Sequence, residues 1–125
     1  MILALDRKPP DAPVRAPRSA DEDATRSERI LRCRACEAAI ASIDDRIEIA
    51  GAHAHTFVNP HGHVFEIGCF ARADGCATIG PPSAFFSWFP GYAWRVAVCA
   101  QCRAHLGWSF GEAPDFWGLV LPNLV

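Results

Sequence analysis

The sequence has few of the features that mark nucleic-acid-binding or membrane proteins. Its 125 residues include one lysine and 12 basic residues in all, against 14 acidic ones, for a net charge of −2. Affinity for phosphates comes mainly from clustered Lys and Arg, so this balance argues against a nucleic-acid partner. The apolar run at residues 2–5 is too short for a signal-peptide core or a membrane span. We therefore expect a cytoplasmic protein with no membrane partner.

Aromatic residues are missing from the first 56 positions, since all 13 lie between Phe57 and Trp117. Residues 1–29 instead hold six basic and six acidic side chains and four prolines. Such a segment buries too little apolar surface to offset its ordering entropy. The sequence therefore predicts a disordered leader over residues 1–28, followed by one domain over residues 29–125.

Six cysteines include two C-x-x-C pairs, Cys33 with Cys36 and Cys99 with Cys102. Three disulfides would suit an exported protein, but no export signal is present. Two such pairs can instead turn four sulfurs toward one point and complete a tetrahedral site for structural Zn²⁺. Disulfide or redox use is the alternative. His105 is a conceivable substitute ligand, but the pattern favours an ordinary histidine on a strand surface.

The remaining pattern is one of short strands broken by turns. We expect strands at 29–33, 46–50, 55–58, 63–70, 93–99, 106–110 and 116–121. Residues 37–43 could form one or two helical turns. Residues 59–62 (N-P-H-G) predict a turn between two strands, and residues 80–83 (G-P-P-S) predict a loop that ends any ladder. The result is a mostly β domain whose halves are fastened by zinc.

The aromatic residues are concentrated in residues 85–94, where Trp88 and Trp94 flank the bend at Pro90-Gly91. If zinc draws the second cysteine pair against the first, the strands carrying Trp94 and Trp108 become neighbours. Three tryptophans could then form a cage for a cation or a flat neutral ring. The alternative is a solid aromatic core without a pocket.

At these residues the chain resembles the CULT domain family, the thalidomide-binding region of cereblon. The likeness rests on S-W-F-P-G-Y-A-W at 87–94, Cys99-x-x-Cys102, H-L-G-W at 105–108, N-P-H-G at 59–62 and F-W-G-L at 116–119. It covers about residues 28–125 and is typical of a stand-alone, bacterial-type member.

The resemblance implies a β-tent, two antiparallel sheets pinned by a structural Zn²⁺ on Cys33, Cys36, Cys99 and Cys102. It implies that a cage holds cyclic imides such as glutarimide, protein ends bearing a cyclised Asn or Gln, or uracil-type metabolites. The Phe86 carbonyl would accept the ring N–H and the Trp88 amide would donate to a ring carbonyl. Phe86 replaces a histidine of vertebrate cereblon, which leaves Ser87, Asn59 or water as the second donor. The full set of implied ligand-binding residues is Asn59, Pro60, Phe65, Phe86, Ser87, Trp88, Trp94, Trp108 and Phe110.

The same residues allow two alternative functions, an enzyme and a protein-interaction module. We expect this chain to contain no counterpart of cereblon's ubiquitin-ligase adaptor region and to have no enzyme activity. A methionine sulfoxide reductase of the B type shares the fold and would need Cys69 or Cys76 as its nucleophile. A protein-interaction module with a filled core is the third reading. We expect His53, His55, His61 and His63 to be solvated loop residues, and Phe116 and Trp117 to belong to the core.

Overall fold

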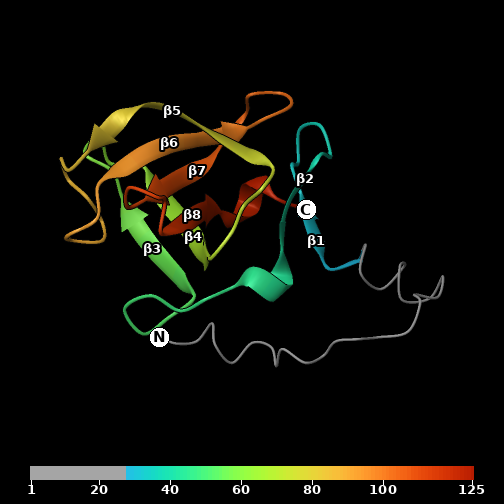
Figure 1. The fold of residues 1–125 in the computed structure, drawn as a ribbon. Coiled ribbons are helices and arrows are strands. Elements are labelled where there is room, and N and C mark those ends of the chain that lie inside the picture. The colour runs from blue at the N-terminus through green and yellow to red at the C-terminus, as the bar shows by residue number, and fades with distance from the viewer. Residues whose placement is uncertain (1–27) are drawn as a thin grey trace.

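The computed structural model describes residues 28–125, which form eight strands and two short 3₁₀ helices (Figure 1). A two-stranded sheet is formed by β1 (Ile30–Arg32) and β2 (Ala39–Ser42). A six-stranded sheet has the order β3-β4-β8-β7-β6-β5, and every pair in both sheets is antiparallel. Its strands are β3 (Ala54–Val58), β4 (Val64–Phe70), β5 (Cys76–Ser83), β6 (Trp94–Cys99), β7 (His105–Phe110) and β8 (Phe116–Val120). The predicted fold class, mostly β with two antiparallel sheets, is confirmed.

Several predicted strands and the turn between two of them are also confirmed. The turn at residues 59–62 joins β3 to β4, where the Asn59 amide donates to the His63 carbonyl at 2.9 Å. Strands β6 and β7 are neighbours, and their register places Val96 opposite Trp108 and Trp94 opposite Phe110. The tryptophan-bearing strands therefore lie side by side, as the sequence predicts.

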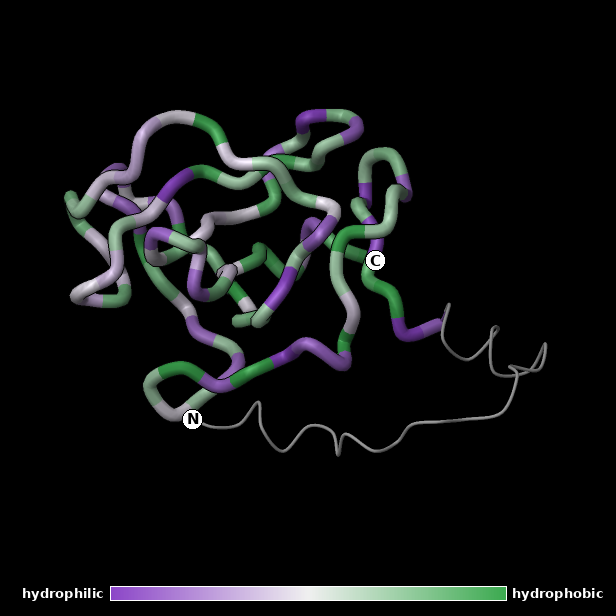
Figure 2. The backbone as a smooth tube through the Cα atoms, viewed as in Figure 1, coloured by the Kyte–Doolittle hydropathy of each residue, from purple (hydrophilic) through white to green (hydrophobic). Residues whose placement is uncertain are grey.

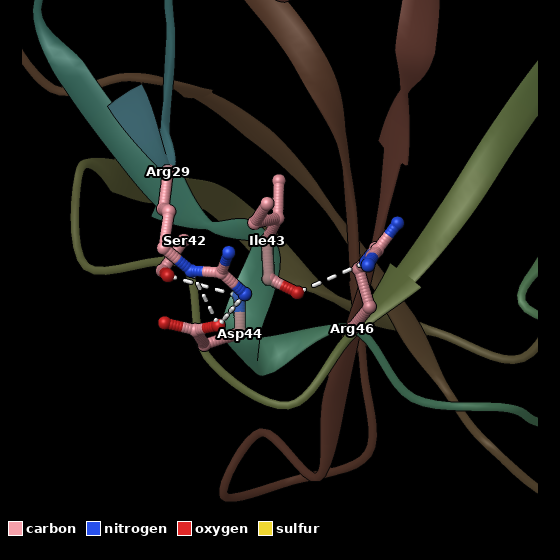
Figure 3. Close-up of polar contacts among 5 residues, drawn as sticks. All are labelled: Arg29, Ser42, Ile43, Asp44 and Arg46. Carbon is pink, nitrogen blue, oxygen red and sulfur yellow. Dashed lines mark hydrogen bonds and ion pairs between the residues drawn. The ribbon is translucent and has the colours of Figure 1, made fainter. Parts of the chain in front are cut away.

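The predicted helical turns at 37–43 were wrong, because this segment forms β2 and then a 3₁₀ helix, η1 (Ile43–Asp45). Glu37 has a φ of 67°, which interrupts any helix at its start. The Ser42 hydroxyl caps η1 by accepting the Asp44 amide at 3.0 Å (Figure 3). Arg29 binds the Asp44 carboxylate, and Arg46 Nε donates to the Ile43 carbonyl at 2.9 Å.

The predicted loop at 80–83 was wrong, because β5 runs through Gly80-Pro81-Pro82 to Ser83. β5 lies at the edge of the sheet. An edge strand tolerates proline, because a backbone N–H that faces away from the sheet is not needed for strand pairing. The register is irregular between Ile79 and Ser83, so the prolines interrupt the pairing without ending the strand.

The strand predicted at 46–50 was also wrong, since only the isolated bridges Arg46 to Phe70 and Ile49 to Ala52 form there. Histidine rings lie within hydrogen-bond distance of backbone carbonyls that would otherwise pair with a neighbouring strand. His53 Nδ1 lies 3.2 Å from the Ile47 carbonyl oxygen, and His55 Nε2 lies 2.9 Å from that of Ile49. These two histidines are half-buried and hydrogen-bonded, so the prediction that they are solvated loop residues was wrong.

Two clusters of buried side chains divide the core. The first is largely aliphatic and contains Cys33, Ile40, Ala41, Phe70, Ala73, Cys99, Leu106, Leu119 and Leu124, with Trp117 packed against it. The second is richer in aromatic residues and contains Ile67, Cys69, Phe89, Phe110, Phe116 and Val120. Phe116 and Trp117 therefore belong to the core, as predicted.

The chain's C-terminal end fastens onto β1, because Arg32 and Val125 exchange backbone hydrogen bonds at 2.9 and 2.8 Å (Figure 1). Residues 28–125 contain no helix long and apolar enough to cross a membrane. The leader predicted at 1–28 lies outside the described residues, apart from Glu28, so it stays a prediction together with the domain boundary.

Candidate functional site

The two C-x-x-C segments fold into matching turns at the ends of β1 and β6. In each turn the first cysteine's carbonyl accepts the amide four residues on, from Glu37 at 2.7 Å and from Arg103 at 2.9 Å. These two residues have φ values of 67° and 69°, which let the chain reverse directly after the second cysteine. The turns lie side by side in Figure 1, and Figure 2 shows hydrophilic residues at the tip of the β6–β7 turn.

Four thiols meet between these turns. The Sγ atoms of Cys33, Cys36, Cys99 and Cys102 all lie within 4.8 Å of one another. Cys33 Sγ lies 3.7 Å from Cys102 Sγ, and Cys36 Sγ lies 3.6 Å from Cys99 Sγ. A disulfide needs about 2.05 Å, whereas a tetrahedral metal site with metal–sulfur bonds of about 2.3 Å has sulfur–sulfur edges of about 3.8 Å. The cluster therefore has the size of a four-cysteine metal site.

The electrostatics of the cluster also favour a cation. Burial raises the pKa of the Cys99 thiol, but the backbone amides of Cys102 and Gln101 and the adjacent thiols outweigh it and lower this pKa to about 7. At Cys36 the Ala38 amide lowers the pKa, while burial and the neighbouring thiols outweigh it and raise the pKa to about 12. Four sulfurs this close cannot all be thiolates unless a cation neutralises them.

A pocket of about 310 Å³ opens at the other end of β6 and β7. Its lining is almost entirely apolar, and its volume is at the lower end of the range for small-molecule sites. The lining residues are Asn59, Pro60, His61, Phe85, Phe86, Trp88, Trp94, Val96, Trp108 and Phe110. Seven of the nine residues predicted to bind a ligand are in this set, and Trp117 is not.

The tryptophan walls are held from behind by rings and by backbone carbonyls. Phe57 stacks on Trp88 at 5.0 Å between ring centroids, and Trp108 meets Trp88 edge-on at 4.8 Å. Trp88 Nε1 donates to the Val58 carbonyl at 3.1 Å, and Trp94 Nε1 donates to the Phe85 carbonyl at 2.8 Å. These contacts fix the indoles in place without filling the pocket.

Two predicted residues, Phe65 and Ser87, do not line the pocket but support it. Phe65 packs edge-on against Trp108 at 5.1 Å. The Ser87 hydroxyl lies 2.7 Å from the Tyr92 carbonyl, to which it donates, and accepts the Phe89 amide at 3.3 Å. Ser87 therefore holds the loop between β5 and β6, and its hydroxyl is already committed.

The polar groups of lining residues that make no hydrogen bond within residues 28–125 include the Phe86 carbonyl, the Trp88 amide and the Asn59 side-chain nitrogen. Asn59 Oδ1 accepts the amides of His61 and His63, both at 2.9 Å, which assigns its other side-chain atom as the NH₂ donor. Phe86 has a φ of 56°, a conformation that costs an L-residue about 1–2 kcal/mol and often marks a functional site.

The sequence analysis missed His61, Phe85 and Val96 as lining residues. Val96 could have been found, because it lies two positions from Trp94 on the same strand and so shares its face. His61 follows Pro60 in the β3–β4 turn, and Phe85 precedes Phe86; neither carries a pattern that distinguishes a pocket residue from an exposed one.

Other candidate groups belong neither to the metal cluster nor to the pocket lining, although the His105 ring packs edge-on against Trp108 at 4.8 Å between ring centroids. His105 is not in the metal cluster, and its Nε2 lies 3.0 Å from the Gly107 carbonyl oxygen. Burial raises the pKa of Cys69 and of Cys76 to about 12. Both thiols are therefore protonated at neutral pH, unlike the thiolate that a reductase would use as its nucleophile.

The fold and these two sites define a small β domain with a four-cysteine cluster able to hold a metal ion and an aromatic pocket of ligand size. No family model matches the chain. Cereblon of Danio rerio is 46% identical over 75 residues, which span 55% of this chain and 17% of that protein. Cereblon of Drosophila simulans is 34% identical over 103 residues, which span 80% of this chain and 16% of that protein. These similarities support a cereblon-like domain of the CULT type in this chain, which spans 16–17% of the length of the cereblon proteins that it matches.

Proposed function

We propose that this domain binds cyclic imides in the tryptophan pocket and that a structural Zn²⁺ on the four cysteines stabilises its fold. The observation that carries the proposal is the pair of unpartnered backbone groups, the Phe86 carbonyl and the Trp88 amide, on residues that line an apolar pocket. The matched segments span only 16–17% of the cereblon proteins, so no activity of a whole cereblon is assigned to this chain.

Zinc fits the cluster because the ligand set is four soft sulfurs at tetrahedral spacing. Its role would be structural, since four protein ligands leave no open position for a substrate. The four cysteines connect the turn after β1 to the turn after β6. The ion would therefore join the two sheets.

A cyclic imide complements the pocket chemically. Its edge presents an acceptor, a donor and an acceptor, and the rest of a glutarimide ring is apolar methylene. We infer that the Phe86 carbonyl accepts the ring N–H and that the Trp88 amide donates to one ring carbonyl. The second ring carbonyl then needs a donor, which the free NH₂ group of Asn59 supplies in place of the family's histidine. Ser87 is unsuited to this role because its hydroxyl is already bound to Tyr92.

The affinity for a bare ring is bounded by its size. About 8 heavy atoms at about −1 kcal/mol each correspond to a Kd of about 1 μM at best. Natural ligands on this proposal are protein ends bearing a cyclised Asn or Gln, or small metabolites with a uracil-type imide edge. The proposal assigns the domain no enzyme activity and no nucleic-acid or membrane partner.

The test is a calorimetric comparison of glutarimide with N-methylglutarimide on the metal-loaded chain. Methylation adds bulk and leaves the Phe86 carbonyl unpaired, so we expect at least a tenfold loss of affinity, from about 1–3 kcal/mol per unpaired group plus the steric cost. Equal binding of the two compounds would refute the edge recognition. Absence of any binding, with tryptophan fluorescence unchanged, would favour a protein-interaction module instead.

A further inference from the structure

A fifth cysteine lies beside the four-cysteine cluster without belonging to it. Cys76 is the first residue of β5 and stands directly opposite Cys99 in the β5–β6 ladder. It packs against the group of buried residues that contains Cys33 and Cys99. Its sulfur is not among the four that lie within 4.8 Å of one another, and Cys76 does not line the pocket. A thiol next to the metal cluster is therefore used by neither site.

The backbone shows which kind of cross-strand pair Cys76 and Cys99 form. The Cys76 amide donates to the Ala73 carbonyl at 3.0 Å, and the Cys99 amide donates to the Ala104 carbonyl at 2.8 Å. Because neither amide donates to the opposite cysteine, the two form a non-hydrogen-bonded pair. In such pairs the Cα atoms are about 4.5 Å apart and the side chains lie on the same face of the sheet. Disulfides have Cα atoms about 4.4–6.8 Å apart, so this pair can be bridged without moving the strands.

The start of β5 is held in place on both sides. The Gly75 carbonyl, directly before Cys76, accepts the Ala100 amide at 2.9 Å, and the Gly75 amide donates to the Ile40 carbonyl at 3.0 Å. These bonds tie the residue before Cys76 both to the end of β6 and to β2. Two reacting groups that a rigid backbone keeps side by side react far faster than the same groups free in solution.

The cysteines around this pair are open to a small oxidant. Cys102 is exposed, and Cys36 and Cys76 are half-buried. The Cys99 Sγ atom accepts the amides of Gln101 at 3.4 Å and of Cys102 at 3.5 Å, and such bonds stabilise negative charge on sulfur. A peroxide oxidises a thiolate to a sulfenic acid, which condenses with a neighbouring thiol to a disulfide. Cys99 is therefore the sulfur to be oxidised, and Cys76 is the thiol that condenses with it.

We propose that a peroxide converts Cys76 and Cys99 into a cross-strand disulfide and that this bond releases the metal ion from the cluster. In the first step the Cys99 thiolate attacks a peroxide oxygen and the O–O bond breaks. With hydrogen peroxide and one proton from solvent, the products are Cys99 sulfenic acid and water. In the second step the Cys76 thiol attacks the Cys99 sulfur, and the S–O bond breaks. The hydroxyl leaves with the thiol proton as a second water, so the two sulfurs are oxidised by two electrons in all and the peroxide is reduced.

The new bond takes one ligand out of the cluster. Cys33, Cys36 and Cys102 keep their thiols, but three sulfurs do not complete the four-coordinate shell of a structural zinc ion, so the affinity for the ion falls. Reduction of the disulfide returns the Cys99 thiol and allows the ion to bind again. The formation of the disulfide depends only on the cysteines, whereas the release of zinc rests on the proposed zinc site.

The test treats the zinc-loaded full chain with one equivalent of hydrogen peroxide and follows free zinc with a colorimetric chelator. We expect two thiols to be lost for each zinc ion released, and excess dithiothreitol with zinc to restore the metal content. Trypsin cuts after Arg72, Arg95 and Arg103, so the bond should join peptide 73–95 to peptide 96–103. Fragmentation of the linked peptides in a mass spectrometer distinguishes Cys99 from Cys102 as the partner.

Two variants that each lack one spare thiol complete the test. Cys76→Ser should hold zinc under reducing conditions and release it at least tenfold more slowly in peroxide. Cys69→Ser is the matched control, because Cys69 is buried opposite Gly118 in a cluster that contains no second cysteine. It should release zinc as fast as the unmodified chain. Equal rates in the two variants, or a bond that joins Cys99 to Cys102 instead, would overturn the inference.

Failure of the zinc proposal and failure of this inference would look different. If the purified chain binds no zinc, the zinc proposal fails, and peptide mapping of the metal-free chain still shows whether Cys76 bonds to Cys99. If the chain holds zinc and peroxide releases it without that bond, only this inference fails. Neither result depends on whether the pocket binds an imide.

Discussion

At the cysteine end of the domain the backbone packs closely around Gly75, whereas the tryptophan end keeps a cavity of about 310 Å³. At the cysteine end, a Cβ atom added to Gly75 would lie 2.0 Å from the Ala39 carbonyl oxygen, and the Gly75 amide donates to the Ile40 carbonyl at 3.0 Å. At the tryptophan end, edge-on and stacked rings brace one another around a space. The comparison teaches that the two ends are built differently: one brings four thiols together in a closely packed backbone, and the other uses rigid rings to keep a pocket open.

Loss of a metal ligand should have the largest effect. Structural zinc contributes about 10–16 kcal/mol in small zinc domains, which equals or exceeds the total stability of a domain this size. Cys99→Ser should therefore abolish cooperative unfolding, measured by circular dichroism, and reduce bound metal from one ion per chain to nearly none. Cys76→Ser is the control, since Cys76 is outside the cluster, and it should keep the metal. If Cys99→Ser folds without bound metal, the metal cluster is not what stabilises the domain.

Adding one methyl group at the cysteine end and one at the tryptophan end tests how tightly each end is packed. Gly75→Ala forces a clash with backbone at the junction of the sheets, so we expect it to lower the free energy of unfolding by about 2–4 kcal/mol. Val96→Ile adds a methyl group beside the cavity and should change the stability by less than about 1 kcal/mol. The same variant should weaken glutarimide binding, because the added group takes up pocket volume. Urea unfolding and calorimetry measure the two effects, and equal destabilisation by both variants would contradict the difference in packing.

Removing one hydroxyl, either at Ser87 beside the pocket or at Ser42 away from it, should have a smaller effect. Ser87→Ala frees the loop beside Trp88, and we expect a loss of about 1–2 kcal/mol in stability together with a severalfold loss of imide affinity. Ser42→Ala removes the cap of η1, at a similar or smaller cost in stability, and should leave the affinity unchanged. If both variants weaken binding equally, the Ser87 hydroxyl does not act through the pocket.

The smallest expected effect concerns pH. Burial lowers the pKa of His105 below its ordinary value of about 6.5, although a hydrogen bond to Gly107 opposes the shift. The unfolded chain then binds this proton more readily, so the free energy of unfolding should fall as the pH drops below about 6.5. His105→Gln keeps a hydrogen-bond donor for the Gly107 carbonyl and should make the free energy of unfolding depend less steeply on pH. The measurement is urea unfolding between pH 5.5 and 7.5 at saturating zinc, and an unchanged slope would contradict it.

The sequence predicted the parts of this structure that follow from spacing and alternation. Cysteine pairs three positions apart indicated the metal cluster, and alternation along residues 94–98 indicated β6. It failed where tertiary contacts override local preference. Proline is a poor strand residue in general, yet residues 80–83 continue β5 because that strand lies at an edge.

The pocket could be predicted only in part. That Trp94 and Trp108 lie near each other follows from the pairing of β6 with β7, but the place of Trp88, and whether the rings meet or leave a space, depends on the groups behind them. Trp88 is held by Phe57 and by the Val58 carbonyl, both from a strand 30 residues away in sequence. Phe65 and Ser87 were predicted as ligand contacts from the family resemblance, which does not distinguish a residue that lines a pocket from one that supports it.

The most direct test of imide binding is a ¹H–¹⁵N spectrum of the metal-loaded chain recorded during a glutarimide titration. Saturable shifts should appear at the Trp88 backbone amide and at the indole signals of Trp88, Trp94 and Trp108. The indole of Trp117, which packs against the aliphatic cluster, should stay in place and serves as the internal reference. Shifts absent at the three pocket indoles, or shifts no larger there than at Trp117, would contradict binding in the tryptophan pocket.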